Sequence, residues 1–232
     1  KPAPFASTYK AIATAPVLIQ NATVLTGTGV RLDNADVLMQ DGKIQAVGKA
    51  LSAPGNAKVI NGTGKWVTPG IIDVHSHLGV YASPGIQATS DGNEAPNAVT
   101  AHVWAEHSVW PQDAGFAKAL AGGVTSMQIL PGSANLVGGR SVILKNVAAT
   151  TYQGMKFPDA PYGIKIEFAG AMSLGLDPDD AQRLVQIDGT CRWSITGGEF
   201  AEILGQGGRI SSSEVGVFFV DRFSQSINGC GG

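Results

Sequence analysis

The chain has 232 residues, of which 44% are hydrophobic and 15% charged, and its formal net charge is −2. This composition excludes an intrinsically disordered chain, and the near-neutral charge argues against a nucleic-acid-binding protein. No segment reaches the ~18 consecutive apolar residues of a transmembrane helix, so we expect no membrane span.

Residues 1–15 are expected to form an N-terminal arm, and residues 16–68 a small antiparallel β module. The patterns predict strands at residues 17–25, 35–40, 43–47, 58–60 and 65–68. Asp41-Gly42 lies between the second and third strands and predicts a tight hairpin turn. The strands are too few and too short to close a sandwich alone, so another segment is expected to complete the module.

Residues 69–168 alternate between strand and helix patterns. Residues 70–75 (GIIDVH) form an unbroken apolar strand of the kind that is buried on both faces of a parallel sheet. Helices are expected at residues 100–110 and 112–121, followed by a second buried strand at residues 124–130. This order predicts a βαβ unit with a right-handed crossover. Further strands are expected at residues 141–146 and 163–168.

Residues 169–232 carry weaker patterns, and we leave them unassigned. A helix is expected at residues 178–187, with Asp177 as its N-cap, and a strand at residues 215–220. Cys191 and Cys230 lack a metal-type spacing, and two independent thiols are favoured over a disulfide.

The sharpest motif is Asp-Val-His-Ser-His at residues 73–77, where the first apolar strand ends. Because side chains alternate along a strand, His75 and His77 project to the same side. Two imidazoles at the carboxyl end of a barrel strand can hold a divalent metal, and barrels place their active sites at that end. Asp73 either orients a ligand or is an ordinary strand residue. The tripeptide alone also occurs in polar loops, but its position after GIID favours a metal.

Residues 67–78 (VTPGIIDVHSHL) resemble the start of the metal-dependent amidohydrolase superfamily, and most of all its imidazolonepropionase-like bacterial branch. The resemblance continues through ALAGGVTSMQILPGSANLVGGR to KFPDAPYGIKI and covers about residues 4–166. It implies an α/β fold in which a (β/α)8 TIM-type barrel is flanked by a β-sandwich. It also implies a metal site, most often zinc, that activates water to hydrolyse a C–N bond.

Carried over to this chain, the resemblance makes His75 and His77 the first two metal ligands. Lys165, in the strand GIKIEF, matches a bridging carboxylated lysine, with a structural lysine or a role for Glu167 as alternatives. Members of the superfamily have further histidines on later strands, whereas no histidine follows His107 here. No carboxylate is assigned as the general base.

His107, Asn135 and Arg140 are candidate substrate-binding residues. Asn135 and Arg140 follow the second barrel strand and lie on the active-site face if the barrel forms, in substrate or loop-anchoring roles. His107 and His102 either line the pocket mouth or are packing or surface residues, and Gly138-Gly139 predicts a tight turn.

A long loop at residues 79–98 carries Asp91, Asn93 and Glu94. Loops of this length inside compact domains are usually functional or mobile. The sequence leaves two interpretations open, a lid over the site and a solvated surface loop.

We therefore expect a hydrolase that cleaves C–N bonds of an amide, cyclic amide or dipeptide-like small molecule with zinc as its divalent metal. A (β/α)8 barrel takes about 250 residues, so the chain is expected to hold only an incomplete barrel and to be truncated. The alternative is a catalytically inactive fragment or a scaffold with an incomplete metal site. A third interpretation joins an unrelated binding module after about residue 168.

The compartment and the assembly are less constrained. The first residues, KPAPFASTYK, lack the apolar core of a signal peptide but are compatible with a processed terminus. Relatives of the branch often carry export signals, which favours the periplasm or the exterior over the cytoplasm. A homo-oligomer is compatible with the sequence.

Overall fold

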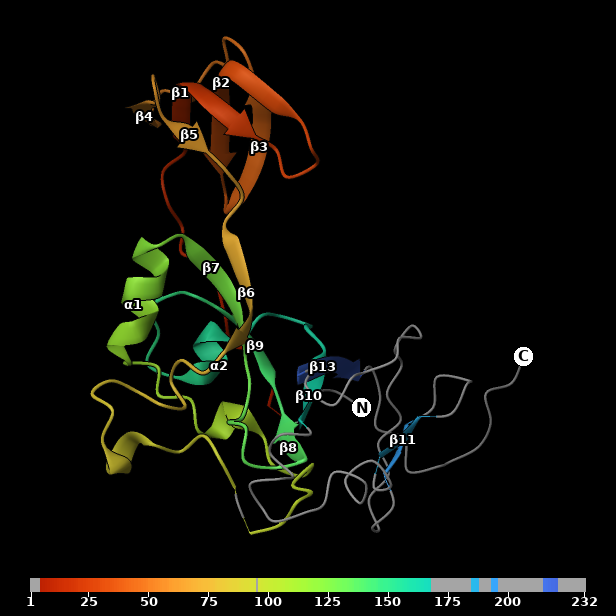
Figure 1. The fold of residues 1–232 in the computed structure, drawn as a ribbon. Coiled ribbons are helices and arrows are strands. Elements are labelled where there is room, and N and C mark those ends of the chain that lie inside the picture. Colours follow the sequence, from red (N-terminus) through yellow and green to blue (C-terminus); the bar gives the residue numbers. More distant parts are fainter. Residues whose placement is uncertain (1–4, 95, 168–184, 188–192, 196–214, 221–232) are drawn as a thin grey trace. The chain divides into compact units, whose positions relative to one another are not determined.

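The computed structural model describes residues 5–94 and 96–167 and the strands at residues 185–187, 193–195 and 215–220. The chain divides into two compact units, one of Lys10–Ile71 and one of Lys1–Tyr9 with Ile72–Gly232. The fold is mixed α/β and consists mostly of strands (Figure 1). Among the described residues, no helix has the length and apolarity needed to cross a membrane.

The first unit is one five-stranded sheet. Its central strand β1 (Val17–Leu25) pairs antiparallel with β2 (Arg31–Gln40), which pairs antiparallel with β3 (Lys43–Gly48). The strands β4 (Lys58–Asn61) and β5 (Trp66–Val67) both pair with β1 in parallel. The expected strands are confirmed, but the expectation of a purely antiparallel module is wrong because the last two strands return along the same edge of β1.

Two local features set the register of this sheet. Asp41 and Gly42 both have positive φ, at 53° and 72°, as a hairpin turn between β2 and β3 requires. Asp36 is buried, and its carboxylate accepts hydrogen bonds from the backbone N–H groups of Asn21 at 2.9 Å and Leu51 at 3.0 Å. The core of the unit consists of short aliphatic side chains on β1 and β2, namely Ala22, Val24, Ala35 and Val37.

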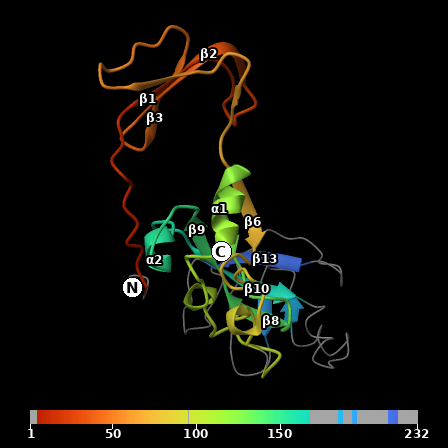
Figure 2. The same cartoon turned by 90° about the vertical axis from the view of Figure 1, so that its left-hand side faces the viewer.

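The second unit begins with the expected βαβ arrangement. Strand β6 (Ile71–Ser76) is followed in the chain by helix α1 (Ala114–Ala121), and both are labelled in Figure 2. Strand β7 (Val124–Ile129) comes next and is a neighbour of β6 in the sheet (Figure 1). The Leu130 N–H donates to the Ser76 carbonyl at 2.9 Å, so the carboxyl ends of the two strands meet, as in parallel neighbours. Strand β9 (Val142–Lys145) then pairs antiparallel with β7.

The second unit also contains a separate three-stranded sheet. It has the order β13–β10–β8, with β8 (Val137–Arg140), β10 (Tyr162–Glu167) and β13 (Val215–Val220), and all pairs are antiparallel. The expected tight turn at Gly138-Gly139 is wrong, because both glycines belong to β8. Gly139 has φ +117°, and a Cβ there would lie 2.7 Å from the Val103 carbonyl oxygen.

The helix expected at residues 100–110 is also wrong. Trp104 forms a parallel bridge with Arg140, the Arg140 N–H donates to the Val103 carbonyl at 2.8 Å, and a 3-10 turn, η2 (Ala105–His107), follows. The segment therefore uses its backbone groups to pair with β8. This tertiary pairing overrides the local helical pattern.

The predictions beyond residue 168 divide between confirmed, wrong and untested. The strand at residues 215–220 is confirmed as β13. The expected helix at 178–187 is wrong at its end, because residues 185–187 form strand β11 (Val185–Ile187), paired antiparallel with β12 (Trp193–Ile195). Cys191 and Cys230 lie outside the described residues.

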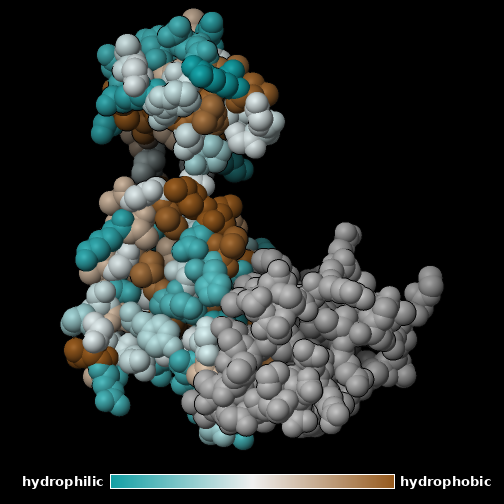
Figure 3. Space-filling view, in the orientation of Figure 1, coloured by the Kyte–Doolittle hydropathy of each residue, from teal (hydrophilic) through white to brown (hydrophobic). Residues whose placement is uncertain are grey.

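Strand β6 is not buried on both faces as expected. Ile72 is 67% exposed and Val74 63% exposed. Hydrophobic surface is visible over this strand in Figure 3. The strand lies at the edge of the sheet β6–β7–β9, and in the described part of the chain β7 is its one neighbour. A buried parallel strand needs a partner on each edge and cover on its faces, which explains the difference.

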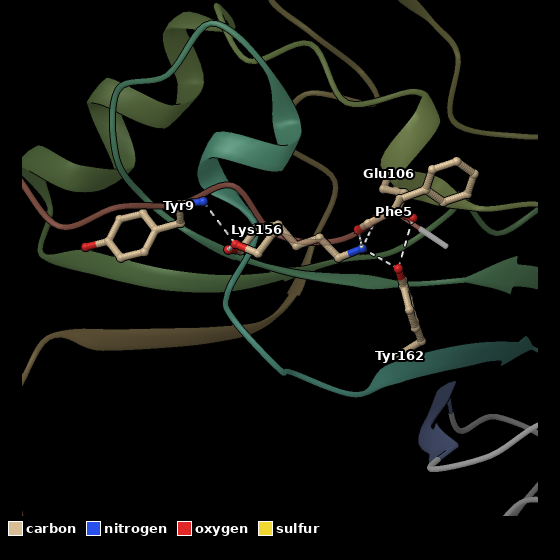
Figure 4. Close-up of polar contacts among 6 residues, drawn as sticks. Phe5, Tyr9, Glu106, Lys156 and Tyr162 are labelled. Carbon is tan, nitrogen blue, oxygen red and sulfur yellow. Dashed lines mark hydrogen bonds and ion pairs between the residues drawn. The ribbon is translucent and has the colours of Figure 1, made fainter. Parts of the chain in front are cut away.

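Phe5, in the N-terminal part of the second unit, contacts a buried ion pair through its carbonyl (Figure 4). Lys156 follows helix α2 (Tyr152–Met155), and its Nζ lies 2.6 Å from Glu106 Oε2 and donates to the Phe5 carbonyl at 2.6 Å. Lys156 Nζ also contacts Tyr162, whose hydroxyl donates to Glu106 Oε1 at 3.1 Å. We refer to Glu106, Lys156, Tyr162 and the Phe5 carbonyl as the ion-pair cluster.

Candidate metal centre

The imidazoles of His75 and His77 meet at the end of β6. Their ring centroids are 5.2 Å apart and their planes cross at 84°, with His75 exposed and His77 half-buried. Two imidazole nitrogens bound to one zinc ion at 2.0–2.1 Å with a tetrahedral angle place the ring centres about 5 Å apart. The pair therefore has the spacing of two ligands of a single zinc ion.

The hydrogen bond of His77 determines which of its nitrogens can bind a metal. His77 Nδ1 lies 2.9 Å from the carbonyl oxygen of Leu130, directly after β7. Because a carbonyl oxygen can only accept, Nδ1 carries a proton, and in the neutral imidazole the lone pair is then on Nε2. This is the common arrangement of a metal-ligating histidine, whose second nitrogen is oriented by a carbonyl or a carboxylate.

Asp73 acts on the backbone of the motif. Its Oδ1 accepts a hydrogen bond from the His75 N–H at 3.1 Å. The structure therefore supports a role for Asp73 within the strand, because its carboxylate is bonded to the main chain that carries the histidines.

Lys165 lies on β10 and is 1% exposed. Its Nζ donates to the Pro131 carbonyl at 3.0 Å and to Ser133 Oγ at 2.7 Å. Pro131 follows Leu130, so Lys165 and His77 bond to the carbonyls of consecutive residues. These contacts suit an ordinary buried ammonium group, and carboxylation of Lys165 stays a prediction.

The donor set gives half of a tetrahedral zinc site. In the part of the chain that the structure describes, no group of three or more His, Cys, Asp or Glu side chains is placed to hold a metal. Two imidazoles fit the chemistry of zinc, but a structural zinc site has four protein ligands and a catalytic site usually three.

Asn135 anchors the long loop. It is buried, and its Nδ2 donates to the backbone carbonyls of Glu94 and of Asn97, the latter at 2.8 Å. Its Oδ1 has no hydrogen-bond partner among the described residues. Substrate binding and loop anchoring are both predicted for Asn135, and these bonds are those of a loop anchor.

Arg140 and His107 lie in an aromatic cluster around Trp104. The guanidinium carbon of Arg140 is 4.5 Å from the Trp104 ring centroid, and the His107 ring lies 4.7 Å from Phe5 and 6.3 Å from Tyr152. The structure brings these two candidates together but through packing contacts, and His102 is exposed. Substrate binding by Arg140 and His107 stays a prediction.

Sequence reasoning missed two contributors to the site. The acceptor of the His77 hydrogen bond is the Leu130 main chain, and a backbone carbonyl leaves no signature in the side-chain pattern. Tyr81 lies with its ring centroid 5.8 Å from that of His77. Its one sequence signal is the spacing of four residues from the histidine.

Comparison with known proteins identifies the family, although no family model matches the chain. The amidohydrolase of Thermotoga maritima, a solved structure, is 38% identical with a TM-score of 0.62, and the match covers 68% of this chain and 41% of that one. Amidohydrolase tasK of Hapsidospora irregularis is 35% identical, with 56% of this chain and 15% of the relative covered. The dihydroorotase of Lactobacillus helveticus is 42% identical, with 37% and 18% covered.

The chain thus spans less than half the length of the relatives it matches. Its identity to several amidohydrolases, the fold shared with one of them and the histidine pair at the end of β6 agree with one another. The chain belongs to the metal-dependent amidohydrolase superfamily.

Proposed function

We propose that the protein is a metal-dependent hydrolase that cleaves a C–N bond of an amide, cyclic amide or dipeptide-like small molecule. The observation that carries this proposal is the geometry of His75 and His77, with ring centres 5.2 Å apart and Nδ1 of His77 occupied by the Leu130 carbonyl. When bound, a divalent metal such as zinc lowers the pKa of water and polarises a carbonyl group.

Matches to named enzymes favour cyclic amides within this class. The D-hydantoinase of Geobacillus stearothermophilus is 49% identical over 26% of this chain, in addition to the amidohydrolases and the dihydroorotase. The incomplete (β/α)8 barrel, the β-sandwich module and the imidazolonepropionase-like branch are parts of the same proposal. The two units and the βαβ element are compatible with them.

The residues of this chain would divide the work as follows. His75 and His77 would hold the metal, His77 through Nε2. Asp73 orients the backbone of His75, and the Leu130 carbonyl orients His77 through Nδ1. Lys165, fixed by Pro131 and Ser133, contributes a third ligand if it is carboxylated. No general base is assigned among the described residues.

Turnover of a substrate panel tests the proposal. The 232-residue chain, loaded with zinc, is incubated with hydantoins, dihydroorotate and dipeptides, and ring opening or amine release is followed. We expect hydrolysis of at least one cyclic amide that is abolished by His75→Ala and by chelation. The matched control is His102→Ala, which removes an exposed histidine outside the motif and should leave turnover unchanged.

The alternative function is a catalytically inactive fragment or a scaffold with an incomplete metal site. It is favoured by the absence of any group of three ligating side chains among the described residues and by the lack of histidines after His107. Weak zinc binding through His75 and His77 with no turnover of the panel supports this alternative. A stoichiometric metal that resists chelators contradicts it.

Location and assembly complete the proposal. We propose the periplasm or the cell exterior as the compartment, a small molecule as the substrate, and homo-oligomerisation as a feature to be tested. Fractionation of cells that express the natural gene and the sedimentation of the purified protein measure these two properties directly.

A further inference from the structure

The ring of Tyr81 lies against the imidazole of His77, with centroids 5.8 Å apart and planes at 82°. The Leu130 hydrogen bond fixes one atom of that imidazole but still lets the ring pivot about it. The Tyr81 contact fixes the plane. Because the lone pair of Nε2 lies in the ring plane, the plane sets the direction in which His77 can bind a metal.

Tyr81 is itself held by a side chain of the long loop. Asn93 Nδ2 donates to the Tyr81 hydroxyl, and Asn93 Oδ1 accepts from the Ala134 N–H at 3.2 Å. The Ala134 N–H can only donate, so it assigns the amide oxygen of Asn93 to its own side and the NH2 group to Tyr81. The backbone beyond β7 therefore orients Asn93, and Asn93 orients the phenol.

Two glycines leave room for this arrangement. A Cβ on Gly132 would overlap the Tyr81 hydroxyl, and a Cβ on Gly92 would overlap the Tyr81 ring. The two glycines are also joined, because the Gly132 N–H donates to the Gly92 carbonyl at 2.7 Å. The phenol therefore lies between the long loop and the segment that follows β7, with 37% of Tyr81 exposed.

Residues 130–134 supply the partners of the side chains at the site. The Leu130 carbonyl accepts a hydrogen bond from His77, and Gly132 lies beside the Tyr81 hydroxyl. The Pro131 carbonyl and Ser133 Oγ accept hydrogen bonds from Lys165. The Ala134 N–H donates to Asn93. We propose that Tyr81 is a positioning residue for the metal site, which fixes the plane of the His77 imidazole and is itself fixed by Asn93 and Gly132. The inference rests on the proposed function only in taking His77 as a metal ligand.

Zinc titration by calorimetry tests this inference without any substrate. We expect Tyr81→Leu, which removes the ring contact, to weaken zinc binding about tenfold, in the range known for residues that orient metal ligands. Tyr81→Phe keeps the ring and removes the hydroxyl, so a smaller loss is expected. Asn93→Ala should equal Tyr81→Phe, and the two together should cause no further loss.

A double-mutant cycle separates positioning from a general loss of structure. In a His77→Ala background, Tyr81→Leu should have no additional effect on the residual zinc affinity. The matched control is Tyr152→Phe, which removes a phenol hydroxyl from the aromatic cluster and should leave zinc binding unchanged. Circular dichroism verifies the fold, and Tyr81→Phe serves as the informative variant if Tyr81→Leu does not fold.

The outcomes distinguish the two claims. If His77→Ala does not change zinc binding by the parent chain, the proposed function fails, and this inference fails with it. If His77→Ala abolishes binding but both Tyr81 variants bind as the parent does, the inference alone is overturned. An equal loss in Tyr152→Phe, or an undiminished effect of Tyr81→Leu in the His77→Ala background, also overturns it.

Discussion

Two polar clusters of the second unit differ in how completely their hydrogen bonds are made. In the ion-pair cluster, Lys156 Nζ has three acceptors and both carboxylate oxygens of Glu106 accept a bond. In the histidine pair, His77 Nδ1 is bonded, but Nε2 has no hydrogen-bond partner among the described residues. A closed network stabilises the fold, whereas an unused imidazole nitrogen near the surface is available to a ligand.

Burial separates the two clusters in the same way. The side chains of Lys156 and Glu106 are 6% and 1% exposed, whereas His75 is exposed. Burial, and then the negative charge of Glu106, raise the pKa of the Tyr162 phenol, which keeps Tyr162 a donor to that carboxylate. The comparison therefore predicts that mutations in the first cluster change stability and those in the second change metal binding.

The largest expected effect is on stability, from Glu106→Gln or Lys156→Met. Each leaves a buried charge without its partner, which costs about 3–5 kcal/mol in the free energy of unfolding. Chemical denaturation measures this loss. The exposed pair Arg31–Asp33, at 2.9 Å, is the matched control, and Arg31→Ala should cost under about 1 kcal/mol. Equal losses from the two pairs would contradict the assigned role.

A smaller loss is expected from Asp113→Ala. Asp113 caps α1, and its carboxylate accepts from the N–H groups of Gly79 at 2.9 Å, Ser83 at 3.0 Å and Gly115 at 2.9 Å. Loss of a cap and of buried acceptors costs about 1–3 kcal/mol in the free energy of unfolding. Denaturation at neutral pH measures it, with the exposed Asp33→Ala as the control.

The same residue predicts a dependence of stability on pH. Burial alone would raise the pKa of Asp113, but the three backbone N–H donors and the charge of Lys118 outweigh burial and lower it. A carboxyl group with a lowered pKa in the fold contributes stability above its unfolded pKa of about 4, which is lost as the pH falls through its folded pKa. Between about pH 5 and pH 2, the free energy of unfolding should therefore fall less for Asp113→Ala than for the parent chain.

The smallest expected effect on stability is that of His75→Ala. The side chain is exposed, and substitutions at such positions usually change the free energy of unfolding by no more than about 0.5 kcal/mol. Thermal unfolding without metal measures the change. A loss as large as that of Lys156→Met would show that the histidine pair is part of the packing and would erase the difference between the two clusters.

The sequence predicted the elements that local patterns define. Residues 17–25 form β1 with the expected bounds, and the Asp41-Gly42 turn and the β6–α1–β7 order are confirmed. Prediction from the sequence failed where pairing between distant segments decides the structure. The segment at residues 100–110 pairs with β8, and the exposed faces of β6 reflect which neighbours are present rather than its own apolar residues.

The candidate site was predictable to a similar extent. The alternation of side chains was enough to place His75 and His77 together, since it depends only on strand geometry. The partners of His77 come from the Leu130 main chain, 53 residues later, and from a tyrosine fixed through Asn93. The Glu106–Lys156 pair spans 50 residues. Contacts at such separations depend on the completed fold and have no local signal.

Nitrogen-15 NMR of the histidine imidazoles during a zinc titration tests the central claim most directly, because it reports the state of each nitrogen. We predict that the Nε2 resonance of His77 and a ring-nitrogen resonance of His75 shift on zinc binding, that His77 Nδ1 stays protonated toward the Leu130 carbonyl, and that His102 and His107 do not respond. Zinc binding at His102 or His107, or through Nδ1 of His77, would contradict the account.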